Sequence, residues 1–194
     1  MARAEGIRRK FYCFLFPMGY FPLLPGITGE TRFKENCLML TEQDYTAAAE
    51  RYLDMVYRIA LNCLRVPADA EDAVQNVMLR LWRTDTDFQS EEHLRRWLVK
   101  VTANECKRLA MHPWHRRRAS LEECPEPVFE DREQRELYRA VMDLPGKYRV
   151  PLYLYYYEGY AVNEVGELLG LKPSTVQTRL ARGREKLKII LTEE

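Results

Sequence analysis

The sequence predicts an all-α protein of two small helical domains joined by a flexible linker. From residue 41 onward, apolar residues recur at steps of three and four, which is the period of amphipathic helices. Residues 112–130 break this period with prolines and many charges, as linkers do. At 194 residues the chain has room for two small domains. We therefore expect domains at 39–111 and 131–194.

The N-terminal residues 1–38 fit neither domain. Arg8, Arg9 and Lys10 precede an apolar stretch at 11–27 that prolines interrupt. The stretch falls short of the ~20 uninterrupted apolar residues of a membrane span, and no small-residue cleavage pattern follows it. We expect a poorly ordered extension. A membrane-tethered signalling protein is the alternative, and it depends on this stretch alone.

Three helices are expected in the first domain. Thr41 to Asp44 has the form of a capping box, so the first helix begins there, and Pro67 ends it. Asp69 is placed to cap the second helix and Ser90 to open the third. Each helix has one apolar face, which predicts a compact three- or four-helix bundle.

The second domain is expected to be helical from Asp131, with a break at Pro145. Residues 150–157 are rich in Tyr, Leu and Val, which favour strands, but the helical surroundings favour a helix. Residues 162–169 predict a short amphipathic helix that ends at a glycine, and a second helix starts at Pro173. This arrangement predicts a helix-turn-helix motif, whose second helix enters the major groove of DNA.

The second helix of that motif has the side chains that DNA reading needs. Short polar groups near its start suit base edges, and longer basic groups further along suit phosphates. A solvated basic surface is the alternative interpretation, but the turn directly ahead favours DNA binding. The expected contacts are Ser174, Thr175, Gln177, Thr178, Arg179, Arg182, Arg184 and Lys186.

Charge is distributed unevenly, although the formal net charge is only +1. Residues 95–118 carry a net +7 and residues 172–188 a net +5, while residues 119–143 carry −5. Two basic blocks predict two contacts with a polyanion. In the first block Asn104 lies among cations and tryptophans, which suits single-stranded DNA. For Trp97 itself a core position is favoured.

An acidic cluster opens the second helix of the first domain. Asp69, Glu71 and Asp72 lie where the helix macrodipole favours acids, so a structural role is one interpretation. The helix continues with Gln75 and Trp82, and exposed Trp and Gln are common at protein interfaces. A docking face is therefore the other interpretation.

The remaining reactive residues do not predict catalysis. The five cysteines are scattered without a CxxC pair, so reduced thiols in a cytosolic protein are expected. The three histidines lack the partners of a metal or triad site, and no glycine-rich phosphate loop exists. We expect no cofactor, no metal and no enzymatic activity.

Five ordered segments resemble one protein family. DAEDAVQ (69–75) and WLVKVTAN (97–104) are similar to the docking and promoter-melting signatures of region 2 of bacterial RNA polymerase sigma factors. LPGKYR (144–149), YYYEGY (155–160) and STVQTRL (174–180) resemble region 4. With no further conserved region between the two, the chain resembles the extracytoplasmic-function subfamily of the sigma-seventy superfamily.

The resemblance implies a subunit that binds core polymerase and directs promoter-specific initiation. The first domain would dock on the clamp helices of the largest subunit, and the flap of the polymerase is a further implied contact. The implied docking residues are Asp69, Asp72, Gln75, Leu79 and Trp82.

The resemblance also implies two promoter contacts. Asn104 would hold a base flipped from the melted minus-ten element, and the loop 88–92 would shape the pocket for its variable base. Thr178 and Arg182 would read the minus-thirty-five element as duplex, with Arg179 and the later cations nearer the phosphates. The minus-ten residues are Phe88, Arg96, Trp97, Lys100, Asn104, Lys107 and Arg108.

An anti-sigma factor is a further implied partner, and we expect a cytoplasmic monomer without a small-molecule substrate. A conventional helix-turn-helix repressor or activator is the alternative, because it shares the C-terminal half of the chain. Such a regulator has no need for the docking and melting segments at 69–104.

The sequence departs from the family pattern at several positions. Asn76 stands where an acid is usual, and Met78 where an aromatic is common. Gly166 and Gly183 replace alanines, and each glycine costs a helix about 1 kcal/mol relative to Ala. A loosened recognition helix is therefore expected. Ala181 stands where some relatives have a bulkier side chain, so their preferred bases do not transfer.

Overall fold

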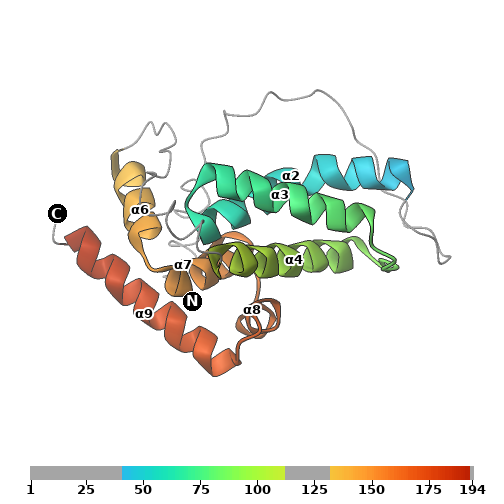
Figure 1. Ribbon diagram of the computed structural model, residues 1–194. Coiled ribbons are helices and arrows are strands. Elements are labelled where there is room, and N and C mark those ends of the chain that lie inside the picture. Colours follow the sequence, from blue (N-terminus) through green and yellow to red (C-terminus); the bar gives the residue numbers. More distant parts are fainter. Residues whose placement is uncertain (1–40, 112–131, 193–194) are drawn as a thin grey trace. The chain divides into compact units, whose positions relative to one another are not determined.

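The computed structural model describes residues 41–111 and 132–192, which belong to two compact units (Figure 1). All the regular secondary structure in these residues is helical, so the predicted all-α class is confirmed. The expected extension at 1–38 and linker at 112–130 lie outside these residues. Among the described helices, none combines the length and hydrophobicity needed to cross a bilayer.

The first unit is a bundle of three long helices, α2 (Glu42–Leu64), α3 (Pro67–Trp82) and α4 (Glu91–Met111) (Figure 1). Each helix packs against the other two. The side chains that fill the interior are apolar and almost fully buried, namely Val56, Ile59, Ala60, Ala70, Ala73, Val77, Leu81, Leu98 and Val99. The apolar period of the sequence therefore faces the core, as predicted.

Two of the predicted helix starts are confirmed. The Asp44 backbone N–H donates to Thr41 Oγ1 at 3.2 Å, and Asp44 Oδ2 accepts from the Thr41 N–H at 3.3 Å, which completes the capping box. At the start of α4, Ser90 Oγ accepts from the His93 N–H at 3.1 Å. These side chains satisfy N–H groups that have no partner within the helix.

The predicted cap of α3 is wrong. The helix begins at Pro67, two residues before Asp69, and Val66 takes the cap position. Proline suits the first turn because its missing N–H would have had no helical partner there. Arg65, in the left-handed conformation at φ 67°, ends α2 just before. Asp69 lies in the first turn of α3 and is 1% exposed.

The second unit is built around a long C-terminal helix. Its elements are α6 (Arg132–Asp143), α7 (Gly146–Leu152), a π-helical turn η1 (Tyr153–Tyr157), α8 (Val162–Leu169) and α9 (Pro173–Thr192). Helices α6, α7 and α8 all pack against α9. The predicted helix at 150–157 is confirmed, with its second half in π geometry. Pro151 has no N–H to donate, which interrupts the α-helical ladder just before this turn.

A buried arginine ties α6 to α7. Arg149 is 2% exposed, and its Nη1 donates to the carbonyl oxygens of Met142 and Leu144, each at 2.7 Å. These carbonyls lie at the end of α6, where helices leave acceptors without partners. A cation at a helix C-terminus also interacts favourably with the helix dipole.

The predicted helix-turn-helix is formed by α8 and α9. Gly170 ends α8 in the left-handed conformation, at φ 67°. The Leu171 N–H donates to the Gly166 carbonyl oxygen at 2.8 Å, so the turn folds back tightly. A Cβ added to Gly166 would lie 2.7 Å from the Leu171 carbonyl oxygen. This close approach explains why a glycine occupies position 166, where helix propensity alone would favour an alanine.

Gly183 does not interrupt the recognition helix, and the expected loosening of that helix stays a prediction. Helix α9 runs unbroken, and Gly183 is buried within it. A Cβ at this position would meet Leu152 Cδ1 at 2.8 Å and Tyr148 Cβ at 3.4 Å. Gly183 therefore allows α7 and α9 to pack closely, which compensates for its low helix propensity.

Candidate nucleic-acid and protein interfaces

The exposed face of α3 carries four of the five predicted docking residues. Asp72, Gln75, Leu79 and Trp82 are all exposed and lie at steps of three and four, so they share one side of the helix. Leu79 is 50% exposed and Trp82 51%. The fifth residue, Asp69, is buried and does not join this face.

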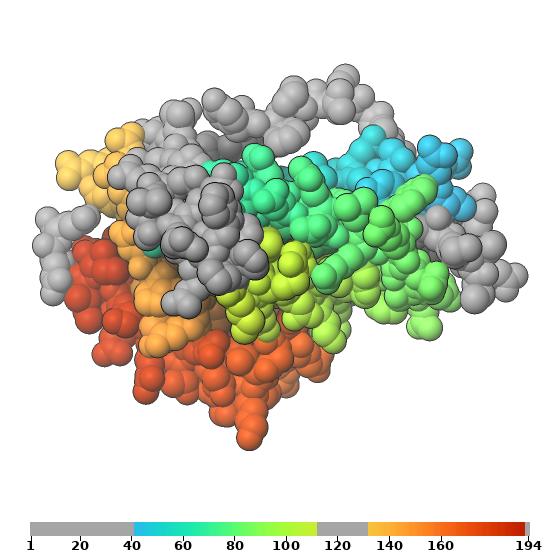
Figure 2. All heavy atoms as spheres, viewed as in Figure 1, coloured from blue at the N-terminus to red at the C-terminus, as the bar shows by residue number. Residues whose placement is uncertain are grey.

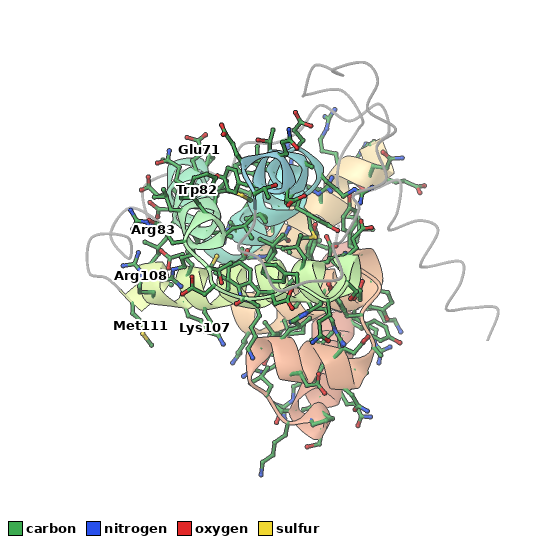
Figure 3. All side chains as sticks on the ribbon, turned by 90° about the vertical axis from the view of Figure 1, so that its right-hand side faces the viewer. Glu71, Trp82, Arg83, Lys107, Arg108 and Met111 are labelled. Carbon is green, nitrogen blue, oxygen red and sulfur yellow. The ribbon has the colours of Figure 1, made fainter. Side chains whose placement is uncertain are left out.

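The orientation of Trp82 is restricted by a contact with α2. Its ring packs edge to face on Tyr45, with the ring centroids 5.1 Å apart. Figure 3 shows Trp82 near the end of α3, beside Arg83. Large apolar side chains that remain half exposed on a helix are typical of protein-binding surfaces.

The two departures from the family pattern on α3 do not lie on this face. Met78 is buried in the core of the bundle, at 6% exposure. Asn76 is half-buried and hydrogen-bonds to the carboxylate of Glu105 on α4. Neither substitution therefore changes the exposed docking surface.

One side of α4 combines an amide with cations. Lys100, Asn104 and Lys107 are exposed at steps of four and three, and Arg96 and Trp97 are half-buried one turn earlier. In Figure 3, Lys107, Arg108 and Met111 project outward from the last turns of α4. Cations beside groups that can stack or hydrogen-bond are suited to single-stranded nucleic acid.

Phe88 is not part of this exposed surface. It is 8% exposed, and its ring packs edge to face on Trp97 and on His93, with centroids 5.5 Å apart in each case. The prediction that Phe88 contacts DNA directly is therefore not supported by its position. Its contacts hold the loop before α4 against the start of that helix. The core position favoured for Trp97 is only partly realised, because its side chain is half-buried.

Glu105 has a structural role that its sequence context does not predict. This carboxylate is 1% exposed and is held by two arginines: Arg108 Nη2 lies at 2.6 Å and Arg80 Nη2 at 2.9 Å. The hydrogen bond from Arg108 lowers the pKa of Glu105, although burial acts in the opposite direction. The spacing of Glu105 and Arg108 is a local signal, but Arg80 comes from α3 and leaves no such signal.

This pairing reduces the cationic character expected of residues 95–118. Arg108 is predicted to contact DNA, yet its guanidinium is engaged with Glu105 through Nε at 3.1 Å as well as Nη2. Its side chain remains 57% exposed, so the outer edge of the guanidinium faces solvent. The charge of Arg108 is therefore partly compensated within the bundle.

The exposed face of α9 presents polar groups first and cations later. Val176, Leu180, Gly183 and Leu187 are buried. At 3.6 residues per turn, the opposite side carries Ser174, Thr178, Arg182 and Glu185. Gln177 is exposed at one flank, while Thr175 and Arg179 are half-buried at the other. The orange-to-red surface of α8 and α9 can be followed in Figure 2.

Two predicted DNA contacts lie away from the centre of this face. Arg184 Nη1 donates to Tyr156 Oη at 3.2 Å, which directs it toward η1. Lys186 lines a cavity of about 200 Å³ together with Asp143, Leu144 and Ile189. Glu185 lies on the central strip between them and would repel phosphates, so an anion-binding surface is limited to the first turns of α9.

Two family models match the chain. Sigma-70 region 2 matches residues 48–120, and Sigma-70, region 4 matches residues 134–187. The first covers most of the three-helix bundle, and the second covers most of the unit that contains the helix-turn-helix.

Characterised relatives are sigma factors. The chain is 29% identical over 154 residues to the ECF RNA polymerase sigma factor SigE of Mycolicibacterium smegmatis, covering 74% of this chain and 60% of that protein. It is 30% identical over 149 residues to the ECF RNA polymerase sigma factor SigM of Mycobacterium tuberculosis, covering 73% of this chain and 74% of SigM. The chain therefore spans less than two thirds of SigE but about three quarters of SigM.

Two solved structures share the fold. The sigma factor RpoE from Bartonella quintana, in complex with the anti-sigma factor NepR, matches with a TM-score of 0.61 and 18% identity over 77% of this chain and 98% of that one. CnrH, in complex with the cytosolic domain of CnrY, matches with a TM-score of 0.57 and 19% identity over 79% and 91%.

Proposed function

This chain belongs to the ECF sigma factors of the sigma-70 family, and we propose that it binds core RNA polymerase and directs initiation at promoters with two spaced elements. The observation that carries the proposal is the pair of polar surfaces on α4 and α9, one in each helical unit. Each surface has the side chains expected for one element, single-stranded at α4 and duplex at α9.

The proposed domains follow the family regions. Residues 39–111 act as the region 2 domain and residues 131–194 as the region 4 domain. Residues 112–130 are the linker between them, and residues 1–38 are an N-terminal extension. The matches to the region 2 and region 4 models support this division.

The first step is docking of α3 on the clamp helices of the polymerase's largest subunit. The half-exposed side chains of Leu79 and Trp82 supply apolar area, and Asp72 and Gln75 supply polar contacts beside them. Asp69 supports this face from inside the bundle. The region 4 domain contacts the flap.

The second step is capture of the melted minus-ten element on α4. Asn104 hydrogen-bonds a flipped base, and Lys100 and Lys107 hold the neighbouring phosphates, because all three are exposed on one side of the helix. Arg96 and Trp97 border this surface, and the outer edge of the Arg108 guanidinium adds to it. Phe88 holds the loop before α4 against the start of that helix.

The third step is reading of the minus-thirty-five element by α9. Thr178 and Arg182 contact base edges, with Ser174 and Gln177 beside them. Thr175 and Arg179 lie at the flank nearer the DNA backbone. Arg184 and Lys186 act at longer range, because their side chains are directed elsewhere.

Membership of the family also leads us to propose a protein regulator, a cellular location and an oligomeric state for this chain. One of the matched structures contains a sigma factor bound to an anti-sigma factor, and we infer that an anti-sigma factor also binds this chain. We further propose that it acts in the cytoplasm as a monomer when unbound and catalyses no reaction itself.

Promoter-dependent transcription tests the proposal. Core polymerase is assayed on a pooled promoter library with and without the protein, alongside the Asn104→Ala and Arg182→Ala variants. We expect initiation from a subset of promoters that share two spaced elements. Asn104→Ala should relax selection at the element nearer the start site, and Arg182→Ala at the distal element. Lys188→Ala, an exposed cation further along α9, is the matched control and should retain both.

The competing function is a conventional helix-turn-helix regulator. Such a protein would bind isolated duplex DNA with nanomolar affinity and would need no core polymerase. If the protein does not bind core polymerase but binds duplex DNA tightly by itself, the helix-turn-helix regulator would replace the sigma factor as the proposed function.

A further inference from the structure

Two arginines from different helices of the first unit meet on one carboxylate. Arg80 of α3 places Nη2 2.9 Å from Glu105 Oε2, and Arg108 of α4 places Nη2 2.6 Å from Glu105 Oε1. Because one carboxylate holds both guanidiniums, the two positive charges lie close together where α3 packs against α4. Two cations and one anion leave this cluster with a surplus of one positive charge.

The carboxylate of the cluster is buried, while both arginines reach solvent. The Glu105 side chain is 0% exposed, whereas that of Arg80 is 50% exposed and that of Arg108 is 57% exposed. Arg108 turns its Nε and Nη2 toward Glu105, so Nη1 lies at the opposite side of the planar guanidinium. A guanidinium has five N–H donors, and each arginine therefore retains donors for a second acceptor outside the bundle.

The cluster borders the surface proposed to hold the minus-ten element. Arg108 follows Asn104 by about one helical turn, so the two side chains are neighbours on α4. Figure 3 shows Arg108 projecting outward from the last turns of α4, together with Lys107. Arg80 brings a guanidinium from α3 to the same carboxylate, so the cationic surface extends from α4 onto α3.

We propose that Arg80 and Arg108 together bind one phosphate of the single-stranded DNA, next to the base that Asn104 holds. This inference rests on the proposed function and adds a residue of α3 to a DNA surface that otherwise lies on α4. The planar fork of an arginine matches the oxygens of a phosphate, and two such forks side by side suit one phosphate better than a single cation does.

Glu105 acts as the positioning residue of this phosphate site. Without an anion between them, two neighbouring guanidiniums would repel each other and move apart. The hydrogen bond from Arg108 holds the pKa of Glu105 below its usual range, so the carboxylate stays ionised at neutral pH. Because both arginine side chains are already held, they lose less conformational entropy when the phosphate binds.

The salt dependence of DNA binding tests the phosphate contact. The full-length protein is titrated into a fluorescein-labelled single strand of mixed sequence, about 20 nucleotides long, and fluorescence anisotropy is measured at several salt concentrations. Each phosphate contact on single-stranded DNA contributes roughly 0.7 to the slope of log affinity against log salt. Arg80→Gln and Arg108→Gln should each reduce the slope by about this amount and weaken binding roughly 2- to 5-fold at the lowest salt.

Two further variants separate the contact from a purely structural role. Arg80→Lys keeps the charge on α3 and should keep most of the slope. Arg51→Gln is the matched control, because Arg51 also pairs with a glutamate of another helix, Glu91, and its side chain is 44% exposed. Arg51 lies on α2, which carries no residue of the proposed DNA surface, so its loss should leave the slope unchanged. Circular dichroism at the assay temperature checks that each variant is folded.

The inference and the proposed function fail in different ways. If folded Arg80→Gln keeps the full slope, or if the wild type does not bind the single strand, the phosphate site is excluded. Promoter-dependent transcription by wild-type holoenzyme would then still support the sigma-factor function. If Arg80→Gln weakens binding to core polymerase and leaves the slope unchanged, Arg80 contacts an acidic group of the polymerase, and the phosphate site is again excluded.

Discussion

At the scale of single residues, a buried charge is tolerated only where hydrogen bonds replace its hydration. Glu105 meets this condition through Arg80 and Arg108, and Arg149 meets it through the carbonyl oxygens at the end of α6. Each group joins two helices of its unit. Removing either group would leave its partners without their charge-assisted hydrogen bonds.

Replacing Glu105 by Gln should destabilise the protein by about 1–3 kcal/mol at neutral pH, because the hydrogen bonds to Arg80 and Arg108 lose their charge. The pKa of Glu105 is lowered in the folded protein. Its stabilising effect is therefore fully present above the unfolded pKa, near 4.5, and is lost as the pH falls through the lower folded pKa. Urea unfolding from neutral to acidic pH measures this.

The stability difference between the wild type and Glu105→Gln should shrink as the pH falls through this window. Glu71→Gln, an exposed carboxylate on α3, is the control and should change stability by less than ~0.5 kcal/mol. A Glu105→Gln curve parallel to the wild type throughout would contradict the role given to the buried carboxylate.

Gly166→Ala should destabilise the region 4 unit by about 1–3 kcal/mol, despite the better helix propensity of alanine. The new Cβ would lie 2.7 Å from the Leu171 carbonyl oxygen, which is backbone and cannot rotate away. Gly146→Ala is the matched control, because nothing lies within 4 Å of its added Cβ. Urea unfolding compares the two, and stabilisation by Gly166→Ala would rule out the close approach.

At the scale of elements, each long helix divides into a buried and an exposed face, and the exposed faces differ in chemistry. The face of α3 retains half-exposed apolar groups, α4 retains an amide with lysines, and the start of α9 retains hydroxyls with an arginine. These differences support the proposal that α3 binds a protein partner and that α4 and α9 bind nucleic acid.

Trp82→Ala should weaken binding to core polymerase by at least ~10-fold, because a large half-exposed aromatic at an interface commonly contributes more than about 1.4 kcal/mol. Leu53→Ala on α2 is the control: Leu53 is 38% exposed but lies on another helix. Fluorescence-detected titration with core polymerase measures both. Circular dichroism checks the fold, because Trp82 also packs on Tyr45. Equal affinities for the two variants would exclude the α3 face.

Glu185→Gln should strengthen binding of the holoenzyme to minus-thirty-five DNA by roughly 2- to 5-fold, because it removes an anion from the centre of the exposed face of α9. Glu167→Gln on α8 is a second exposed carboxylate and serves as the control. Promoter binding at several salt concentrations provides the measurement. An unchanged affinity would place the DNA contact earlier on the helix than we propose.

At the scale of the whole molecule, two compact units each contain their own core and their own proposed DNA surface. A chain of this kind can engage two separate promoter elements at once, which raises the effective concentration of the second surface once the first is bound. The specificity of the protein is then the combined specificity of the two surfaces.

The double variant Asn104→Ala/Arg182→Ala tests this independence. Free-energy effects of distant sites add, so the loss in open-complex formation should equal the product of the two single losses, within about a factor of two. The measurement is the rate of open-complex formation at a holoenzyme concentration below saturation. A double variant no worse than the weaker single variant would mean that the two surfaces act as one step.

The sequence by itself determined the helical class, most helix starts and the helix-turn-helix. The capping box at Thr41, the breaks at Pro67 and Pro145 and the glycine at the end of α8 act over a few neighbouring residues, so they can be read locally. The exposed positions of Asn104 and Thr178 followed from the same periodicity.

Only the tertiary structure decided which groups are buried and which meet across helices. Asp69 and Phe88 proved buried, and Arg80 proved to share Glu105 with Arg108. These contacts depend on the register in which one helix packs against another. That register follows from the fit of many side chains at once, so no local pattern in the sequence specifies it.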